Sequence, residues 1–136
     1  MDPVVHFELP YKDRQRIAAF YGDAFGWKLQ MLGAEMGHYV LATTAEPGSA
    51  LPAPPGAVPG AINGGFFEAK PDWPAQHPSI VIAVQDLGAA MERVRRAGGE
   101  VLGEPIDIPG VGPYVSFLDS EGNRISLLQP APPQGR

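Results

Sequence analysis

The stretch Val4-Val5-His6-Phe7-Glu8-Leu9 decides the fold, because the sequence unit that it opens begins again 73 residues later. Shifted by that distance, six positions fall on matching residue types without a gap: Phe7 on Ile80, Leu9 on Ile82, Asp13 on Asp86, Ala24 on Ala97, Gly26 on Gly99 and Leu29 on Leu102. A repeat of this length indicates one supersecondary unit that is built twice.

Each copy carries signals for the same local elements. Apolar and polar residues alternate over Val4–Leu9, which predicts a half-buried strand, and Ser79–Val84 is a more uniformly apolar strand. Asp13 and Asp86 stand where a helix needs an N-cap acceptor, and glycines end both helices. The apolar residues at helical spacing in the first helix are Ile17, Phe20, Tyr21 and Ala24.

The later strands of the two copies also correspond. Tyr39–Leu41 resembles Tyr114–Leu118, and Ala61–Phe67 resembles Asn123–Leu128. Each unit therefore has the order strand, helix, strand, strand, strand. One such unit buries its sheet and helix poorly, whereas two together can form a core. We predict an α+β fold in which two tandem βαβββ modules form a cupped mixed sheet with the helices outside and a cavity inside.

The length of 136 residues fits one domain. We expect a single domain over 1–136, with module one over 4–70, a linker over 71–77, module two over 78–129 and a tail over 130–136. Prolines and glycines crowd residues 46–60, which predicts a long surface loop there.

Composition excludes several functional classes. The formal net charge is −5, and basic residues gather only at Arg93, Arg95 and Arg96, so we expect no nucleic-acid partner. No cysteine is present, which excludes disulfides and thiolate chemistry. The sequence shows neither a signal peptide nor an apolar run of about 18 residues, so we expect no membrane partner and a cytoplasmic protein.

Several of these motifs together resemble the vicinal oxygen chelate superfamily, over residues 4–129. They are the strand around His6, the segments Phe20-Tyr21 and Phe25-Gly26-Trp27, the second helix with its Gly98-Gly99 end, and the run Asp119-Ser120-Glu121-Gly122-Asn123-Arg124-Ile125. This superfamily includes glyoxalases, extradiol dioxygenases, fosfomycin-resistance enzymes and bleomycin-sequestering proteins. The resemblance implies a homodimer with a small-molecule ligand in the cup; one scaffold hosts both enzymes and binders.

In the metal-dependent members, His or Glu ligands from the first and last strands of each module hold a divalent ion. His6 matches the first of these positions. The resemblance carries the others onto Ser79, Ser126 and a residue near Asn63 or Gly64, none of which is His or Glu. We therefore expect no metal and no other cofactor. The alternative is a divalent metal at a displaced site made of His6, Glu68 and His77.

The expected ligand-binding set combines polar tips with aromatic walls, as small-molecule pockets do. It comprises His6, Glu8, Trp27, Tyr39, Asn63, Phe66, Ser79, Tyr114 and Ser126. Alternation alone does not decide which of the aromatic residues lie in the core instead. His6 could act as a catalytic base, line the cavity or be a satisfied buried group. The adjacent Gly64 and Gly65 indicate either a bulge that curves the sheet or a close approach of the ligand to the backbone.

Three functions fit these observations. The first is a metal-independent protein that binds an apolar or aromatic small molecule in the cup. The second is a metal-dependent glyoxalase-like lyase or dioxygenase with the displaced site. The third is a metal-free enzyme, such as an isomerase, in which His6 is the base.

Overall fold

The computed structural model describes residues 1–45 and 60–131, and the chain divides into two compact units. The first unit is His6–Trp73, and the second unit is Met1–Val5 together with Pro74–Arg136. Apart from Gly60, the predicted surface loop over 46–60 lies outside the described residues.

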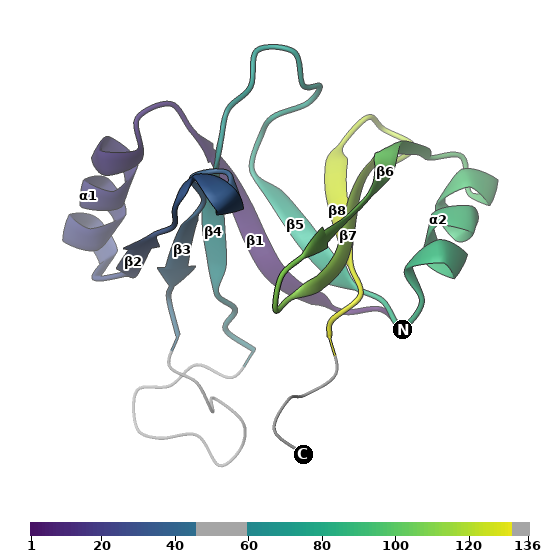
Figure 1. Cartoon of the computed structure of the whole chain (residues 1–136), viewed down its shortest axis with the longest axis horizontal. Helices are drawn as coiled ribbons and strands as arrows, with labels where there is room; N and C mark the ends of the chain where they lie inside the picture. The colour runs from purple at the N-terminus through teal and green to yellow at the C-terminus, as the bar shows by residue number, and fades with distance from the viewer. Residues whose placement is uncertain (46–59, 132–136) are drawn as a thin grey trace. The chain divides into compact units, whose positions relative to one another are not determined.

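The two units have the same order of elements (Figure 1). The elements of the first half are β1 (Val4–Tyr11), α1 (Arg14–Phe25), β2 (Lys28–Met31), the short 3-10 helix η1 (Ala34–Met36), β3 (Val40–Thr43) and β4 (Gly64–Glu68). Those of the second are β5 (Ser79–Ala83), α2 (Leu87–Arg96), β6 (Glu100–Ile108), β7 (Gly112–Leu118) and β8 (Arg124–Leu128). The α+β class predicted from the sequence is confirmed.

Strand pairing follows one scheme in both units. The strand order is β2-β3-β4-β1 in the first and β6-β7-β8-β5 in the second. The first strand of each unit runs parallel to the last, since β1 pairs with β4 and β5 with β8. The remaining pairs are antiparallel. Each unit therefore contributes both parallel and antiparallel pairs, as the predicted mixed sheet requires.

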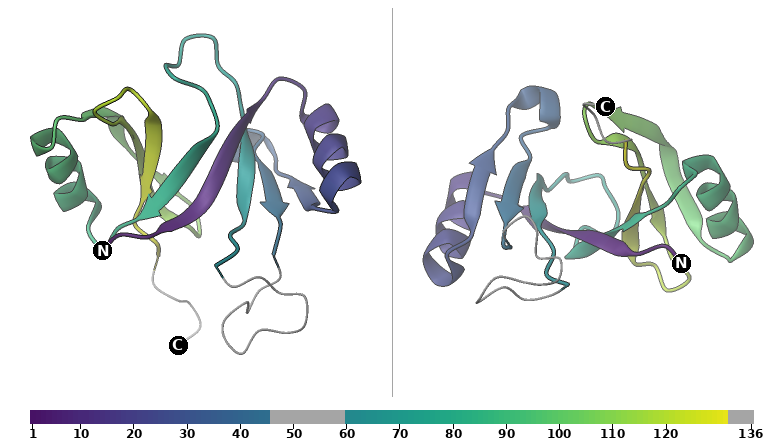
Figure 2. Two further views of the ribbon diagram at one scale, coloured as in Figure 1. Left: turned by 180° about the vertical axis from the view of Figure 1, so that it is seen from behind. Right: turned by 90° about the horizontal axis from the view of Figure 1, so that it is seen from below.

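Each helix packs against the sheet of its own unit (Figure 2). The core beside α1 is formed by the buried residues Tyr11, Val40, Ala42 and Phe66, with Phe7, Leu9, Ile17, Tyr21, Trp27 and Leu29 around them. The core beside α2 is formed by Val84, Leu87, Ala90, Met91, Val115, Phe117 and Leu127. Among the described residues, no helix is long and apolar enough to cross a membrane.

The inward face of α1 is narrower than its sequence pattern predicts. Ile17 and Tyr21, one turn apart, contact the core, whereas Phe20 is 58% exposed and Ala24 is also exposed. Phe20 directly precedes Tyr21, so it lies about 100° around the helix from it, and its ring packs edge-on against Tyr21 instead of against the sheet.

Both predicted helix N-caps are confirmed. The Asp13 side chain accepts from Arg16 N, and the Asp86 side chain accepts from Ala89 N, each over 3.0 Å. We expect Asp86→Ala to lower the free energy of unfolding by about 1–2 kcal/mol and Asp13→Ala by about 0.5–1 kcal/mol. The difference arises because α2 buries Leu87, Ala90 and Met91, whereas α1 buries no residue. Urea unfolding of the two variants measures this difference in the free energy of unfolding. A larger loss of stability for Asp13→Ala than for Asp86→Ala would contradict the prediction.

Candidate functional site

Strand register divides the first sheet into two faces. The residues that pack towards α1 on β1, β3 and β4 include Phe7, Leu9, Val40 and Phe66. Their neighbours along the strands point to the other side, because side chains alternate. His6, Glu8 and Gly65 therefore share the opposite face, where Glu8 pairs with Gly65 across the parallel ladder. We call this surface, with Leu41 and the Tyr39 side chain, the far face of the first sheet.

Three polar side chains form a continuous hydrogen-bonded cluster on the far face. The Tyr39 hydroxyl donates to Glu8 Oε2 over 2.9 Å and lies 3.0 Å from His6 Nε2. Glu8 is only 7% exposed, so its carboxylate depends on partners inside the protein. Burial lowers the pKa of His6 below its usual value, which favours the neutral imidazole at physiological pH. The cluster therefore combines a buried carboxylate, a hydroxyl and a neutral histidine.

Gly65 provides the space in which Tyr39 lies. A Cβ atom at position 65 would stand 2.1 Å from Tyr39 Cε2 and 2.3 Å from its Cζ and hydroxyl oxygen. A Cβ at Gly64 would likewise meet the Phe7 ring, at 2.5 Å. The ladders of β4 with β1 and with β3 run without a register shift, so the bulge considered from the sequence is wrong. Close packing explains both glycines: the Tyr39 ring lies against Gly65, and both the ring and the backbone carbonyl of Phe7 lie against Gly64.

A tight turn directly before Tyr39 places its side chain over Gly65. Gly37 and His38 both adopt positive φ angles, 65° and 57°, directly before Tyr39. The hydrogen bonds that hold the turn include those from His38 N to Gly33 O and from Tyr39 N to Met36 O, and the Tyr11 hydroxyl donates to the His38 carbonyl over 2.7 Å. The left-handed conformation is unfavourable for a residue with a Cβ, so the surrounding bonds must impose it on His38.

The second unit carries a counterpart of this arrangement. Tyr114 and Ser126 form a hydroxyl–hydroxyl hydrogen bond of 2.7 Å, and Ser116 lies 3.0 Å from the same Ser126 oxygen. Ser116 and Ser126 are both buried. Ser79 does not join them, because its hydroxyl donates to the Arg124 carbonyl over 2.5 Å. Three hydroxyl groups therefore lie together on the second sheet.

The registers identify the matching positions of the two units. Gly65 pairs with Glu8, and Ser126 pairs with Val81, which lies 73 residues after Glu8. Gly65 is therefore the counterpart of Ser126, which corrects the expectation of a residue near Asn63 or Gly64. At both positions a tyrosine of the neighbouring strand brings its hydroxyl to the last strand of the unit.

Three of the expected ligand-binding residues have other roles. Trp27 and Phe66 belong to the core beside α1, where Trp27 stacks on Tyr21 with 4.6 Å between ring centroids. Phe66 is completely buried. Asn63 accepts from the backbone N–H groups of Thr44 and Ala45, at 2.8 and 2.9 Å, and so fixes the start of β4 beside the end of β3. These three assignments are corrected; the far face retains His6, Glu8 and Tyr39.

The displaced metal site is not assembled. Glu68 pairs with Tyr11, five residues beyond His6 on β1, so the two side chains are separated by roughly 16 Å along the strands and point to opposite faces. Glu68 instead forms an ion pair of 2.7 Å with Lys70, which lowers its pKa. His77 is exposed. Within residues 1–45 and 60–131, no three His, Asp or Glu side chains gather closely enough to hold a metal ion.

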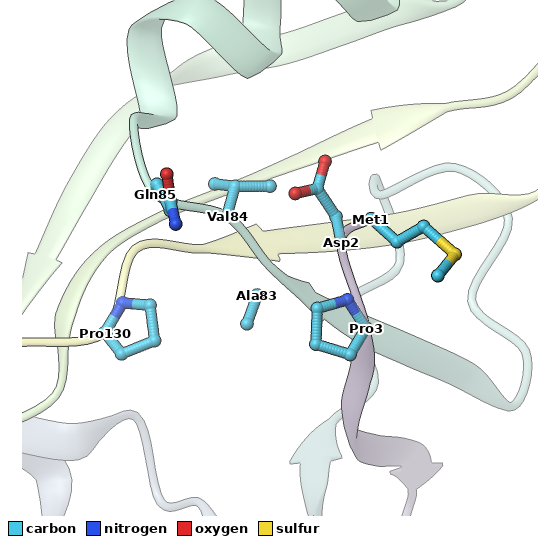
Figure 3. A pocket seen from close by; sticks show the side chains of 7 residues that line it. All are labelled: Met1, Asp2, Pro3, Ala83, Val84, Gln85 and Pro130. Atoms are coloured by element: carbon cyan, nitrogen blue, oxygen red, sulfur yellow. The ribbon is translucent and has the colours of Figure 1, made fainter.

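A hollow of about 320 Å³ in the second unit contains none of the expected site residues (Figure 3). Its lining consists of Met1, Asp2, Pro3, Ala83, Val84, Gln85 and Pro130. The carboxylate in this set, Asp2, forms an ion pair with Arg93 over 3.2 Å. The other lining side chains are apolar or neutral, so they offer no chemistry comparable to the cluster on the far face.

Comparisons with known proteins agree on one family. The model of the glyoxalase/bleomycin resistance protein/dioxygenase superfamily matches residues 4–127. A glyoxylase-like domain-containing protein of Didymella fabae is 32% identical over 118 residues, which cover 85% of this chain and 84% of the relative.

Solved structures share the fold at low sequence identity. Methylmalonyl-CoA epimerase of Mycobacterium tuberculosis superposes with a TM-score of 0.63 at 19% identity, covering 95% of this chain and 88% of the epimerase. A hypothetical protein of Bacillus halodurans reaches a TM-score of 0.66 at 12% identity, with 99% of both chains covered. At such identities the likeness concerns the fold alone.

Proposed function

Since the chain belongs to the glyoxalase/bleomycin resistance protein/dioxygenase superfamily, we propose that it is a metal-independent small-molecule-binding protein whose ligand contacts the far face of the first sheet. The observation that carries this proposal is the tyrosine hydroxyl at the last strand of each unit, Tyr39 at Gly65 and Tyr114 at Ser126. These are the last-strand positions at which metal-dependent members of the family hold a ligand.

The donor set at the family's metal positions does not fit a divalent ion. Gly65 has no side chain, and Ser79 donates its hydroxyl hydrogen to a backbone carbonyl. The Ser126 hydroxyl is bonded to Tyr114 and Ser116. Neutral hydroxyls are weak ligands beside carboxylate, imidazole or thiolate, and His6 alone does not hold a catalytic ion. We therefore derive no chemical step through a metal.

The far face has the composition of a binding surface. Leu41, which pairs with Gly65, is 36% exposed and lies beside the polar cluster. The Tyr39 ring adds an aromatic surface over Gly65. Apolar surface next to a few oriented polar groups is the usual composition of a small-molecule site. This supports an apolar or aromatic ligand that is oriented by His6, Tyr39 and Glu8.

Elemental analysis of protein purified without chelators tests metal independence. We expect substoichiometric Ni, Zn, Mn and Fe, and a melting temperature unchanged by EDTA or by added metal, because no ligand set is assembled. The control variant His77→Ala removes an exposed histidine that could capture metal during purification. One equivalent of metal that persists in His77→Ala and disappears in His6→Ala would overturn the proposal.

A thermal-shift screen with small aromatic compounds tests binding at the far face. A ligand at a hundred times its dissociation constant adds about 2.7 kcal/mol to the free energy of unfolding. We expect compounds that stabilise the wild type to lose that effect in Leu41→Asp, which places a charge on the exposed apolar part of the far face. Equal stabilisation of the variant by every such compound would locate binding elsewhere.

A further inference from the structure

The direction of one hydrogen bond sets the protonation pattern of the whole cluster. The Tyr39 hydroxyl has a single hydrogen, which it donates to Glu8 Oε2. Towards His6, the tyrosine oxygen can then serve only as an acceptor. The tyrosine oxygen and His6 Nε2 are 3.0 Å apart, so in this hydrogen bond the imidazole Nε2–H is the donor.

The tautomer of His6 follows. A neutral imidazole carries one hydrogen and one lone pair, so a hydrogen on Nε2 leaves the lone pair on Nδ1. Burial disfavours the doubly protonated ring and lowers the pKa of His6, which is consistent with the neutral form. Tyr39 and Glu8 thus act as positioning residues that fix the ring orientation and the tautomer. His6 presents Nδ1 as a hydrogen-bond acceptor.

The neighbouring far-face residues also favour a ligand without negative charge. The Glu8 carboxylate lies next to His6 on the same face of β1, separated by one residue. An anion at His6 would therefore lie next to this carboxylate. An ionised carboxylate or phosphate also has no hydrogen that it could donate to Nδ1.

We infer that the ligand of the far face is a neutral or cationic molecule that donates an N–H or O–H hydrogen bond to His6 Nδ1 and lays an apolar or aromatic body against Tyr39 and Leu41. Phenols and aryl or alkyl ammonium compounds belong to this class, whereas carboxylates and phosphates do not. The inference rests on the proposed function, because it specifies the ligand class for the same surface.

Four probes of similar size test the ligand class: phenol, benzylammonium, anisole and benzoate. Binding is followed by NMR titration of the uniformly 15N-labelled full chain, with the His6 signals as the local reporter. Phenol and benzylammonium are expected to bind roughly 2- to 10-fold more tightly than anisole and benzoate, the range that one net hydrogen bond gives. The variant His6→Gln retains an amide near the Nε2 position but has no Nδ1. Phenol and benzylammonium should therefore bind this variant about as tightly as anisole and benzoate do.

The tautomer has its own readout. Ring 15N shifts of the wild type are expected to report the Nε2–H tautomer of His6 almost alone. In Tyr39→Phe, which keeps the ring over Gly65 but removes the acceptor, both tautomers should be populated. A wild-type His6 with its hydrogen on Nδ1 would overturn the inference.

The outcomes of these experiments separate the inference from the proposed function. Equal binding of all four probes at the far face, or no response of His6 to any of them, would overturn the inferred ligand class. The proposed metal-independent binding function would survive equal binding. A stoichiometric metal lost in His6→Ala would instead overturn the proposed function itself.

Discussion

Gly65→Ala is expected to displace Tyr39 from the far face and to lower the free energy of unfolding by about 2–4 kcal/mol. The new methyl group would stand 2.1–2.3 Å from two ring atoms and the hydroxyl oxygen of Tyr39, far inside contact distance. Relief of this clash moves the hydroxyl away from His6 and from the buried Glu8, whose carboxylate loses a partner. Urea unfolding measures the loss of stability, and the NMR signals of His6 report the loss of the cluster.

A double-mutant cycle isolates the cause of this effect. If the Tyr39 ring is what the methyl group meets, Gly65→Ala should cost little in a Tyr39→Ala background, and the two substitutions should couple by more than about 1 kcal/mol. Gly88→Ala is the matched control, because a Cβ there would be 3.6 Å from Oδ1 of the N-cap residue Asp86, an ordinary van der Waals contact. We expect it to stabilise α2 by about 0.5–1 kcal/mol. An equal cost of Gly65→Ala in both backgrounds would contradict the assigned role of Gly65.

The sequence predicted the elements because their signals are local. Asp13 and Asp86 mark the helix starts, and the same N-cap bonds appear in the structure. The alternation over Val4–Leu9 is clear enough to place His6 and Glu8 on one face of β1. These signals need only the neighbours of each residue along the chain. The α+β class follows from them.

The last strand of the first unit could not be aligned from the sequence to within one residue. Asn63-Gly64-Gly65-Phe66-Phe67 has no alternation of apolar and polar side chains, so its register is not encoded locally. The comparison of Ala61–Phe67 with Asn123–Leu128 places the counterpart of Ser126 near Asn63 or Gly64, whereas the ladders set Gly65 there. A shift of one residue moves every side chain to the other face, so the sequence alone does not decide that Phe66 lies in the core. The apolar pair Phe66 and Leu127 would have given the correct alignment.

The hydroxyl clusters were beyond sequence reasoning for a different reason. Tyr39 and Tyr114 were both expected in the site, but their significance depends on what each hydroxyl meets. Those partners lie on other strands, such as Glu8 on β1 and Ser126 on β8. Ser116 carried no pattern that would have connected it with Ser126. Hydrogen bonds between distant strands become visible only when the register is known.

Phe66→Ala is expected to lower the free energy of unfolding by about 3–5 kcal/mol, the usual cost of removing a buried aromatic ring from a core. Phe66 has no exposed surface, and its ring lies 5.3 Å from that of Tyr21 and 6.4 Å from that of Trp27, between centroids. Removal of the ring leaves a cavity beside α1 that the rigid strands fill poorly. At about 4 °C for each kcal/mol, the melting temperature should fall by roughly 10–20 °C.

Phe67→Ala is the matched control, since it removes the same side chain from the next residue of β4. Phe67 is only half-buried and points to the face opposite Phe66, so its loss should cost about 1–2 kcal/mol. Phe66→Ala should also leave the ratio of phenol to anisole binding unchanged, because its ring lies behind the sheet from His6. If Phe66→Ala were as stable as Phe67→Ala and changed the ratio of phenol to anisole binding, Phe66 would point to the far face. The register of β4, and with it the place of Gly65 under Tyr39, would then be one residue wrong.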